Sequence, residues 1–346
     1  MRCPARIALT LLLTVARSPA AAQAPSSGTT YHVAHAFTIG GEGFWDYLTY
    51  DRVYRRLFLS HATQVEVVDP ENGKLVGRIP DTPGVHGVAL AQDLGRGFVS
   101  NGRDSSVTVF DLGSLAVTGR VWVTGRNPDA ILYDSTSHRV LTFNGGSANA
   151  TALDAATGRV LGTLPLGGKP EFAVSDGRGA VYVNIEDRGQ IVKLDPVRLA
   201  VRSRWPMADC EEPTGLALDR SHGRLFSTCG NGWMAVVDAE TGRMLARLPI
   251  GHGTDGCAFD PASALAFASN GEGTITVVRE DSPDSFHVVG TVPTRRGART
   301  ITLDPATHRL FTVTAELGPP QAPTPEQPHP RPSIVQGTFT LLVIEP

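Results

Sequence analysis

Seven positions along the chain carry most of the side chains that could do chemistry. Each lies five residues before the end of a short apolar segment, and these segment ends recur at intervals of 40 to 44 residues. The seven residues, called the ring residues below, are Asp46, His86, Asp129, Glu171, Thr214, Asp255 and Arg299. If the repeats close into a ring, these side chains meet in one small space. With the imidazole neutral, the ring residues then carry a formal charge of −3.

Clustered carboxylates favour the binding of a cation. They repel one another, so some should have raised pKa values unless a cation relieves the repulsion. Oxygen-rich surroundings suit Ca²⁺ or Mg²⁺, and a nearby imidazole leaves room for Zn²⁺. The candidate metal ligands are Asp46, Asp129, Glu171 and Asp255. His86, oriented by Asp46 or Asp129, could instead act as a general base, which makes it the candidate catalytic residue.

A second set of side chains lies ten residues after each segment end, where the following strand should finish at the same mouth. The set comprises His61, Asn101, Asn144, Glu186, Cys229, Asn270 and Thr314, with Asn184 or Ile185 as alternatives to Glu186. Taken together, the candidate ligand-binding residues are Asp46, His61, His86, Asn101, Asp129, Asn144, Glu171, Asp255, Asn270 and Arg299.

Each of these residues also has a purely structural interpretation. Polar side chains in a channel need no ligand, because ordered waters can satisfy them. Arg299 falls between Asp255 and Asp46 in the ring, and an ion pair across repeats would be weak evidence for function. The asparagines could brace the next loop through hydrogen bonds from side chain to backbone.

The elements that must position these residues are short strands. Each repeat contains three apolar runs rich in Val, Ile, Leu, Phe and Thr, such as Ala130–Tyr133, Val140–Phe143 and Thr151–Leu153. Several repeats share a turn in which Gly follows Asn or Thr, as in Asp69–Lys74 and Asp154–Arg159. Four-stranded units of this period predict an all-β, seven-bladed propeller.

The last repeat has only three strands of its own. They are expected at Thr300–Leu303, Leu310–Thr314 and Thr338–Ile344. The segment Tyr31–Ile39, which precedes the first repeat, has the apolar alternation of a strand and should complete the last blade. Pairing between the two ends of the domain would remove the exposed sheet edge. A single domain is therefore expected over residues 31–346.

The N-terminal segment has the composition of a secretory signal. Arg2 and Arg6 precede the apolar run Ile7–Val15, and the small residues 18–22 follow, so cleavage is expected after Ala22. Residues 1–22 would be the signal peptide and residues 23–30 a flexible linker. The apolar run is too short to span a bilayer. The protein is expected to be periplasmic or secreted.

Composition and net charge limit the classes of molecule that the protein is expected to bind. The chain is 41% hydrophobic and 19% charged, as expected of a folded domain. Without the predicted signal the net charge falls from −3 to about −6, which favours neither nucleic acid nor an anionic membrane. Motifs for nucleotides, haem attachment and serine hydrolysis are absent from the sequence. We expect a monomer without a transmembrane segment.

Three cysteines remain after the predicted cleavage. Cys210 and Cys229 fall on the same face of the fifth repeat, and export would place them in an oxidising compartment, so a disulfide between them is the preferred hypothesis. Cys257 should be a buried strand residue. A thiol metal site has less support, because the sequence has no C-x-x-C pair.

Residues 318–332 hold seven prolines and interrupt the last repeat between its second and third strands. Proline at this density excludes regular sheet pairing and favours an extended, semi-rigid loop. The loop should face the channel mouth. It could be a lid or a docking strap, or simply a surface insertion.

The repeats resemble those of the YVTN β-propeller family, and of its YncE-like secreted members in particular. Degenerate forms of the namesake tetrapeptide occur at Phe98–Asn101, Tyr182–Asn184 and Phe267–Asn270. The segment Val107–Asp111 is similar to the strand that follows it, and Gly125–Pro128 to the family's Gly-x-x-Pro loop. The resemblance extends from about Tyr31 to the C-terminus and implies the propeller fold. The family includes binding and scaffold proteins, and related propellers include lactonases and lyases.

Two functions therefore remain open. The first is an exported binding protein that recognises a small polar or cationic ligand, a metal or a protein partner at the acidic channel mouth. The second is a metal-dependent hydrolase or lyase of lactonase type that uses the same carboxylates and His86. Whether the protein is an enzyme, and whether it carries Ca²⁺, Zn²⁺ or no metal, is left open by the sequence. His61 and Cys229 stand where other repeats have Asn, which favours a specialised mouth.

Overall fold

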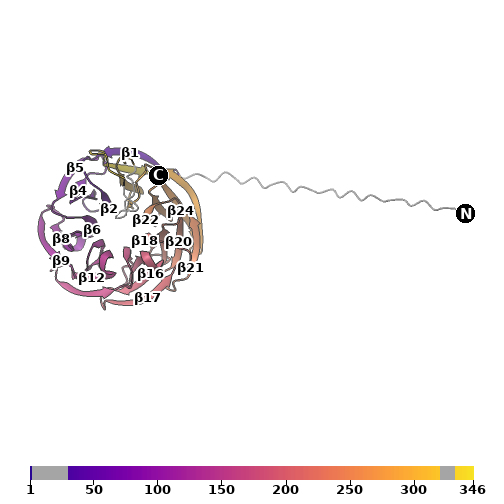
Figure 1. Cartoon of the computed structure of the whole chain (residues 1–346), viewed down its shortest axis with the longest axis horizontal. Helices are drawn as coiled ribbons and strands as arrows, with labels where there is room; N and C mark the ends of the chain where they lie inside the picture. Colours follow the sequence, from indigo (N-terminus) through magenta and orange to yellow (C-terminus); the bar gives the residue numbers. More distant parts are fainter. Residues whose placement is uncertain (2–29, 320–331) are drawn as a thin grey trace.

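A computed structural model describes residues 1, 30–319 and 332–346 as seven four-stranded antiparallel sheets arranged in a ring (Figure 1). The seven-bladed propeller expected from the repeats is thus confirmed. The predicted signal peptide and linker, and most of the proline-rich segment, lie outside the described residues. In the part of the chain that is described, no helix is long and apolar enough to cross a membrane.

The strands follow one another blade by blade, from the channel to the rim. Blade 1 contains β2 (Trp45–Asp51), β3 (Arg56–His61), β4 (Gln64–Val68) and β5 (Leu75–Ile79), and blade 2 contains β6 (Val85–Ala91), β7 (Arg96–Asn101), β8 (Ser106–Asp111) and β9 (Val117–Trp122). Blade 3 contains β10 (Pro128–Asp134), β11 (Arg139–Asn144), β12 (Asn149–Asp154) and β13 (Val160–Pro165), and blade 4 contains β14 (Pro170–Ser175), β15 (Val181–Ile185), β16 (Gln190–Asp195) and β17 (Ala200–Pro206). Three short 3-10 turns occur at η1 (Gln92–Leu94), η2 (Gly145–Ser147) and η3 (Glu186–Arg188).

The remaining blades repeat the same order. Blade 5 contains β18 (Pro213–Asp219), β19 (Arg224–Cys229), β20 (Trp233–Asp238) and β21 (Met244–Pro249), and blade 6 contains β22 (Thr254–Asp260), β23 (Leu265–Asn270), β24 (Thr274–Ser282) and β25 (Ser285–Pro293). Blade 7 contains β26 (Thr302–Asp304), β27 (Arg309–Thr314), β28 (Thr340–Glu345) and, at its outer edge, β1 (His32–Thr38). The inner strands lie around the channel in Figure 1, with β5, β9, β17 and β21 at the rim.

The hydrophobic core lies between the blades. Seven clusters of buried apolar residues occur in the described chain, and each joins two neighbouring sheets. Between blades 1 and 2, for example, Phe58 packs with Phe110 at a ring-centroid distance of 5.6 Å. Because no blade has a core of its own, each sheet depends on its neighbours for burial. The ring is therefore one packing unit.

The ring closes where the two ends of the domain meet. β1 pairs antiparallel with β28, and Phe37 lies opposite Leu341. In Figure 1 the indigo β1 runs beside the yellow C-terminal strand. Tyr31 is buried in the cluster between blades 6 and 7 together with Ile344. The closing strand predicted over Tyr31–Ile39 is confirmed.

Turn chemistry matches the sequence, with small differences at strand ends. Gly73 and Gly158 close the expected hairpins with φ angles of 69° and 75°, a left-handed conformation that glycine adopts at little cost. The inner strand of blade 4 ends at Ser175, one residue earlier than its counterparts suggest, because the amide of Asp176 already bonds to the carbonyl of Ala180.

Candidate functional site

A cavity of about 530 Å³ lies at the end of the channel where the inner strands begin. It takes residues from six of the inner strands and from the loop before β26. All seven ring residues line it: Asp46, His86, Asp129, Glu171, Thr214, Asp255 and Arg299. The repeat register therefore gathers the residues that the sequence singled out, although they are spread over more than 250 positions of the chain.

A β-bulge at the start of the inner strand aims the ring residue in blades 1 to 6. Asp46 lies between Trp45 and Leu48, where the pairing register of β2 with β3 shifts. The same shift occurs at the matching place in blades 2 to 6, and it encloses His86, Asp129, Glu171, Thr214 and Asp255. A bulge breaks the strict alternation of a strand and re-aims one side chain. Here it turns that side chain into the channel.

Side chains of neighbouring blades hold the bulged backbone in place. Ser100 donates a hydrogen bond to the carbonyl of Asp129 over 2.5 Å, and Asn184 donates to the carbonyls of Thr214 and Gly215 over 2.8 and 3.1 Å. Thr300 donates to the carbonyl of Asp46 over 3.0 Å. These bonds satisfy carbonyls that the sheet ladder leaves unpaired. The ring residues are thus mounted on a fixed frame.

His86 lies between two carboxylates. Its Nδ1 is 2.6 Å from Asp46 Oδ2 and 3.4 Å from Asp129 Oδ1. Burial lowers the pKa of His86, but the hydrogen bond to Asp46 and the negative charges of both carboxylates outweigh burial and raise this pKa to about 9. A pKa raised in this way favours the protonated form of His86 at neutral pH.

The same three residues could hold a metal ion. Asp46, His86 and Asp129 each offer a ligand atom, and these atoms lie within 4.8 Å of one another. Burial raises the pKa of Asp129, and the charge of Asp46 adds to it against the opposing charge of His86. A metal would have to displace the proton on His86, because only the neutral imidazole ligates.

Across the cavity, Glu171 and Glu186 share one lysine. Lys169 Nζ lies 2.8 Å from Glu171 Oε1 and also contacts Glu186 Oε2. Burial raises the pKa of Glu171, and the charge of Asp129 and the hydrogen bond with Glu186 raise it further. Burial opposes ionisation of Glu186 as well, but hydrogen bonds from Glu171 and Lys169 outweigh it and lower its pKa. One carboxyl of the pair is protonated and the other is charged.

Arg299 pairs with a carboxylate of the neighbouring blade. Its Nε donates to Asp255 Oδ2 over 2.7 Å, and its guanidinium lies 5.9 Å from the ring centroid of Trp45. Burial lowers the pKa of Arg299, but the charges of Asp255 and Asp46 outweigh burial and raise it. The ion pair across repeats that the sequence allows is thus present, and it lies in the cavity wall.

Tyr47, in the cavity wall, contacts a second aromatic side chain, Phe172. Tyr47 comes from blade 1 and Phe172 from blade 4, nearly opposite in the ring, yet their ring centroids are only 5.3 Å apart in an edge-to-face contact. The hydroxyl of Tyr47 also lies 3.4 Å from Glu171 Oε2. Burial and the surrounding carboxylates raise the pKa of Tyr47 well above its usual range, so the hydroxyl stays neutral.

Most of the second set of predicted residues, those at the ends of the second strands, do not face the cavity as the ring residues do. The asparagines point into their own blades: Asn101 donates to Ser106 and Thr108, Asn144 to Asn149 and Thr151, and Asn270 to Thr274 and Thr276. His61 is buried against Phe339 with a ring-centroid distance of 4.1 Å. These four side chains do not line the cavity, so we leave them out of the proposed site. Glu186 does line it.

The cavity lining also includes two cations and a tyrosine that were not among the predicted ligand-binding residues. Lys169 and Arg103 come from loops that lead toward the channel, and Tyr47 follows a ring residue directly. Lys169 lies in the Gly-Lys-Pro loop two positions before Glu171, so its place next to a bulge was a usable signal. Tyr47 has one aromatic equivalent in the other repeats, Phe172, which directly follows the ring residue Glu171.

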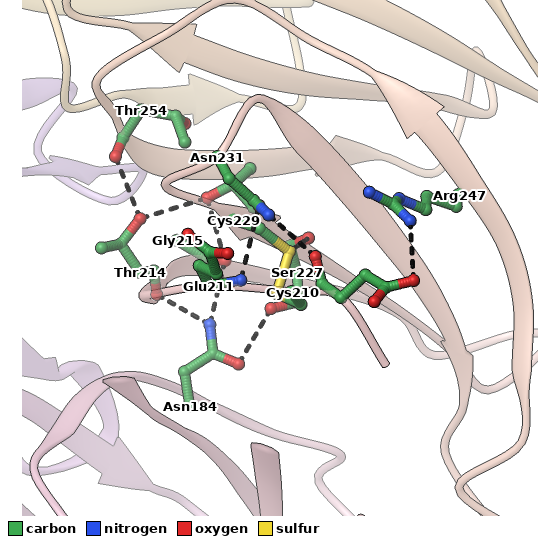
Figure 2. Close-up of a disulfide and its surroundings, with 12 residues drawn as sticks. Asn184, Cys210, Glu211, Thr214, Gly215, Ser227, Cys229, Asn231, Arg247 and Thr254 are labelled. Carbon is green, nitrogen blue, oxygen red and sulfur yellow. Dashed lines mark hydrogen bonds and ion pairs between the residues drawn. A yellow bond between two sulfur atoms is a disulfide. The ribbon is translucent and has the colours of Figure 1, made fainter. Parts of the chain in front are cut away.

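A disulfide holds the loop that leads into blade 5. Cys210 is bonded to Cys229 at the end of β19, with their Cα atoms 5.3 Å apart, and these are the two cysteines that the sequence paired (Figure 2). Asn184 of blade 4 reaches the backbone beside this loop. Cys257 is a buried thiol whose pKa is raised by burial. The bridge lies next to Thr214 and stabilises one side of the cavity.

Comparison with known proteins supports the fold. No family profile matches the sequence, and no curated protein matches it. Among solved structures, the chain is similar to hydrazine synthase of Kuenenia stuttgartiensis, with a TM-score of 0.70 and 16% sequence identity. The match covers 80% of this chain and 93% of that one. At this identity the similarity shows the fold alone.

Proposed function

We propose that this protein binds a small, positively charged molecule in the central cavity and does not turn it over. The supporting observation is the charge balance of the cavity wall. Five carboxylates line it, against three permanently cationic side chains: Asp46, Asp129, Glu171, Glu186 and Asp255 against Arg103, Lys169 and Arg299. A concave site with converging polar groups is the default place for a ligand.

Protons compensate for the excess of carboxylates when no ligand is bound. The raised pKa values of His86, Asp129 and Glu171 mean that the cavity takes up positive charge from solvent. An ammonium or guanidinium group would supply the same charge and release protons. A cavity of about 530 Å³ has room for a molecule larger than a single ion.

Calorimetry with a defined set of cations tests this proposal. The probes are a diamine, a polyamine, an agmatine-like guanidinium amine and a quaternary ammonium compound, each titrated in two buffers of different ionisation enthalpy. We expect one class to bind with proton release, and Asp129→Asn to weaken it at least tenfold. The matched control is Asp281→Asn, since Asp281 is an exposed carboxylate outside the cavity. No binding by any probe, or equal affinity in Asp129→Asn, would contradict the proposal.

A metal-dependent lactonase is the second candidate. It is favoured by one observation, the convergence of Asp46, His86 and Asp129 on a space that a metal ion could fill. In that case the carboxylates and His86 would hold the metal, and the metal would polarise a lactone carbonyl. Elemental analysis of purified protein and a panel of lactones and esters, compared with His86→Ala, test it. Protein without metal that is inert toward every substrate would exclude it.

We further propose that the protein works outside the cytoplasm, as a monomer of the YncE-like YVTN type. The Cys210–Cys229 disulfide supports export, because such bonds persist in oxidising compartments. The repeat motifs support the family assignment. Fractionation of cells that express the full chain, followed by N-terminal sequencing and size-exclusion chromatography, tests all three points. An uncleaved cytoplasmic protein would contradict export.

A further inference from the structure

We propose that the protein has a second ligand site, for a divalent transition metal ion such as Zn²⁺, at the junction of blades 5 and 6. Its ligands are Asp219, His222 and Glu280, whose ligand atoms lie within 4.8 Å of one another. Asp219 ends β18, whose other end carries Thr214 in the cavity. The site is therefore separate from the central cavity.

The three side chains converge closely. His222 Nδ1 lies 2.7 Å from Asp219 Oδ2 and 2.9 Å from Glu280 Oε1. The two carboxylates are almost completely buried, with 3% and 2% of their side-chain surface exposed, whereas the imidazole is half exposed. A cation could reach the group from the side of His222, where a cavity of about 430 Å³ opens.

In three of the other blades a hydroxyl side chain occupies the place of His222. Three residues after the Asp that ends the inner strand, Ser137, Ser263 and Thr307 each donate a hydroxyl hydrogen bond to that Asp. Such a hydroxyl completes the turn between the first two strands. Blade 5 has an imidazole there instead. Turn formation does not require this change, because the amide of His222 already bonds to Asp219.

Glu280 departs from the repeat in the same way. Its amide bonds to the carbonyl of Ala264, just after the third strand pairs with the second. The residues with this amide bond in blades 2, 3 and 5 are Leu112, Ala155 and Ala239, all buried and apolar. A carboxylate therefore replaces an apolar core residue at the one junction where an imidazole replaces a hydroxyl.

One oxygen of this carboxylate has no partner. Glu280 is 5% exposed, and its Oε2 has no hydrogen-bond partner among the described residues. Arg224 also interacts electrostatically with Glu280, but its guanidinium is engaged by Asp238 at 2.7 Å and by the carbonyl of Pro283 at 2.6 Å. A buried carboxylate oxygen that has no hydrogen-bond partner destabilises the fold, and a bound cation is a standard way to satisfy it.

The ligand set identifies the class of metal. One imidazole nitrogen and two carboxylates, with a side open to solvent, match a three-ligand zinc site with a free fourth position. Ca²⁺ would require six to eight oxygen ligands, which this group lacks. Ligand atoms around tetrahedral zinc stand about 3.3 Å apart. The distances of 2.7 and 2.9 Å therefore widen slightly when the metal replaces the proton on His222.

Two variants that restore the repeat pattern test the site. Glu280→Ala reproduces Ala155 and Ala239, and His222→Ser reproduces Ser137 and Ser263, so both should fold. Zn²⁺ affinity is measured on the purified full chain by competition with a chromophoric chelator, and Co²⁺ serves as a spectroscopic probe of tetrahedral ligation. The background is a His86→Gln, Asp129→Asn protein, so that the central cavity contributes no signal.

We expect the background protein to bind one Zn²⁺ and to give the visible Co²⁺ spectrum, and each repeat-restoring variant to lose at least tenfold in affinity. His308→Ser is the matched control, because His308 contacts only one carboxylate, Asp260 Oδ2 at 2.8 Å, and should leave binding unchanged. Absence of Zn²⁺ binding in the background protein, or unchanged affinity in Glu280→Ala, would overturn the proposal. If one variant fails to fold, the other decides.

Discussion

At the scale of single residues, His86 determines how the fold responds to pH. Its pKa is raised from 6.5 to about 9 in the folded protein, so the fold binds this proton more tightly than the unfolded chain does. The stabilisation is fully present below pH 6.5 and is lost as the pH rises through 9. Asp129 and Glu171 act in the same direction, because their raised pKa values also favour the protonated form.

We therefore predict that the free energy of unfolding falls by about 1–3 kcal/mol between pH 6.5 and 9. His86→Asn should remove much of this dependence, since asparagine keeps a donor to Asp46 but does not titrate. Urea denaturation at several pH values measures the effect. His138→Asn is the control, as His138 is exposed in the turn between β10 and β11. Equal slopes for wild type and His86→Asn would contradict the prediction.

The ring residues could be predicted from sequence because the repeat register fixes their place, whatever the side chain. The asparagines and His61 could not, because the direction of a strand-end side chain depends on single-residue register. A bulge shifts the inner strand by one residue and leaves its partner unshifted. Asp129 consequently faces the channel, and Asn144, on the partner strand, faces its own blade.

At the scale of elements, the inner strands of blades 5 and 6 approach each other through glycine. A Cβ on Gly215 would lie 2.5 Å from the carbonyl carbon of Gly256, which real side chains do not tolerate. Gly256 is equally crowded, because its Cβ would lie 2.8 Å from the backbone nitrogen of Ile301. These contacts bring the bulges close enough to share hydrogen bonds, as between Thr214 and the carbonyl of Thr254 at 3.1 Å.

Gly215→Ala should accordingly destabilise the protein by at least about 2 kcal/mol, because the backbone on the other side cannot move away. Gly119→Ala is the matched control. It lies in the exposed β9, where an added Cβ meets no atom within 4 Å, and its stability should stay within about 0.5 kcal/mol of wild type. Chemical denaturation of both variants gives the comparison. Similar denaturation midpoints for Gly215→Ala and Gly119→Ala would contradict the prediction and show that blades 5 and 6 can separate at this junction.

The Cys210–Cys229 disulfide should also raise the stability of the fold by a measurable amount. It closes a loop of 19 residues, and loss of such a crosslink costs about 3 kcal/mol through the entropy of the unfolded chain. We predict that Cys210→Ser with Cys229→Ser lowers the melting temperature, and that a reductant lowers that of wild type but not of the double variant. Cys257→Ala serves as the control, since Cys257 is unbonded. A melting temperature insensitive to reductant would contradict the prediction.

The strands themselves were predicted closely, since alternating apolar residues and turn glycines define them locally. In blade 3 the observed strands exceed the predicted runs by two or three residues. Contacts between blades were beyond sequence reasoning. Lys169 reaches Glu186 only because η3 follows the shorter β15, a difference of one residue that the repeat pattern leaves ambiguous.

At the scale of the whole molecule, stability depends on the pairing of β1 with β28. Without β1, the last blade would expose a sheet edge and the cluster that contains Tyr31. Deletion of residues 31–39 should therefore lower the melting temperature by more than about 10 °C or prevent folding, as expected for the loss of several kcal/mol. Adding residues 31–39 back as a separate peptide should restore part of the lost melting temperature. A deletion protein that melts like wild type would contradict this account of closure.

The overall ring was the part of the structure most accessible from sequence, because seven equal repeats leave few other arrangements. The contact of Tyr47 with Phe172 was the least accessible, since both follow a ring residue but come from nearly opposite blades, and the repeat pattern does not show which side chains meet across the ring.

That contact also bears on how a ligand would occupy the cavity. Tyr47, in the cavity wall, meets Phe172 from the nearly opposite blade, so the contact ties together two sides of the ring next to the carboxylates. Any two compounds that bind in the cavity will compete for the same space.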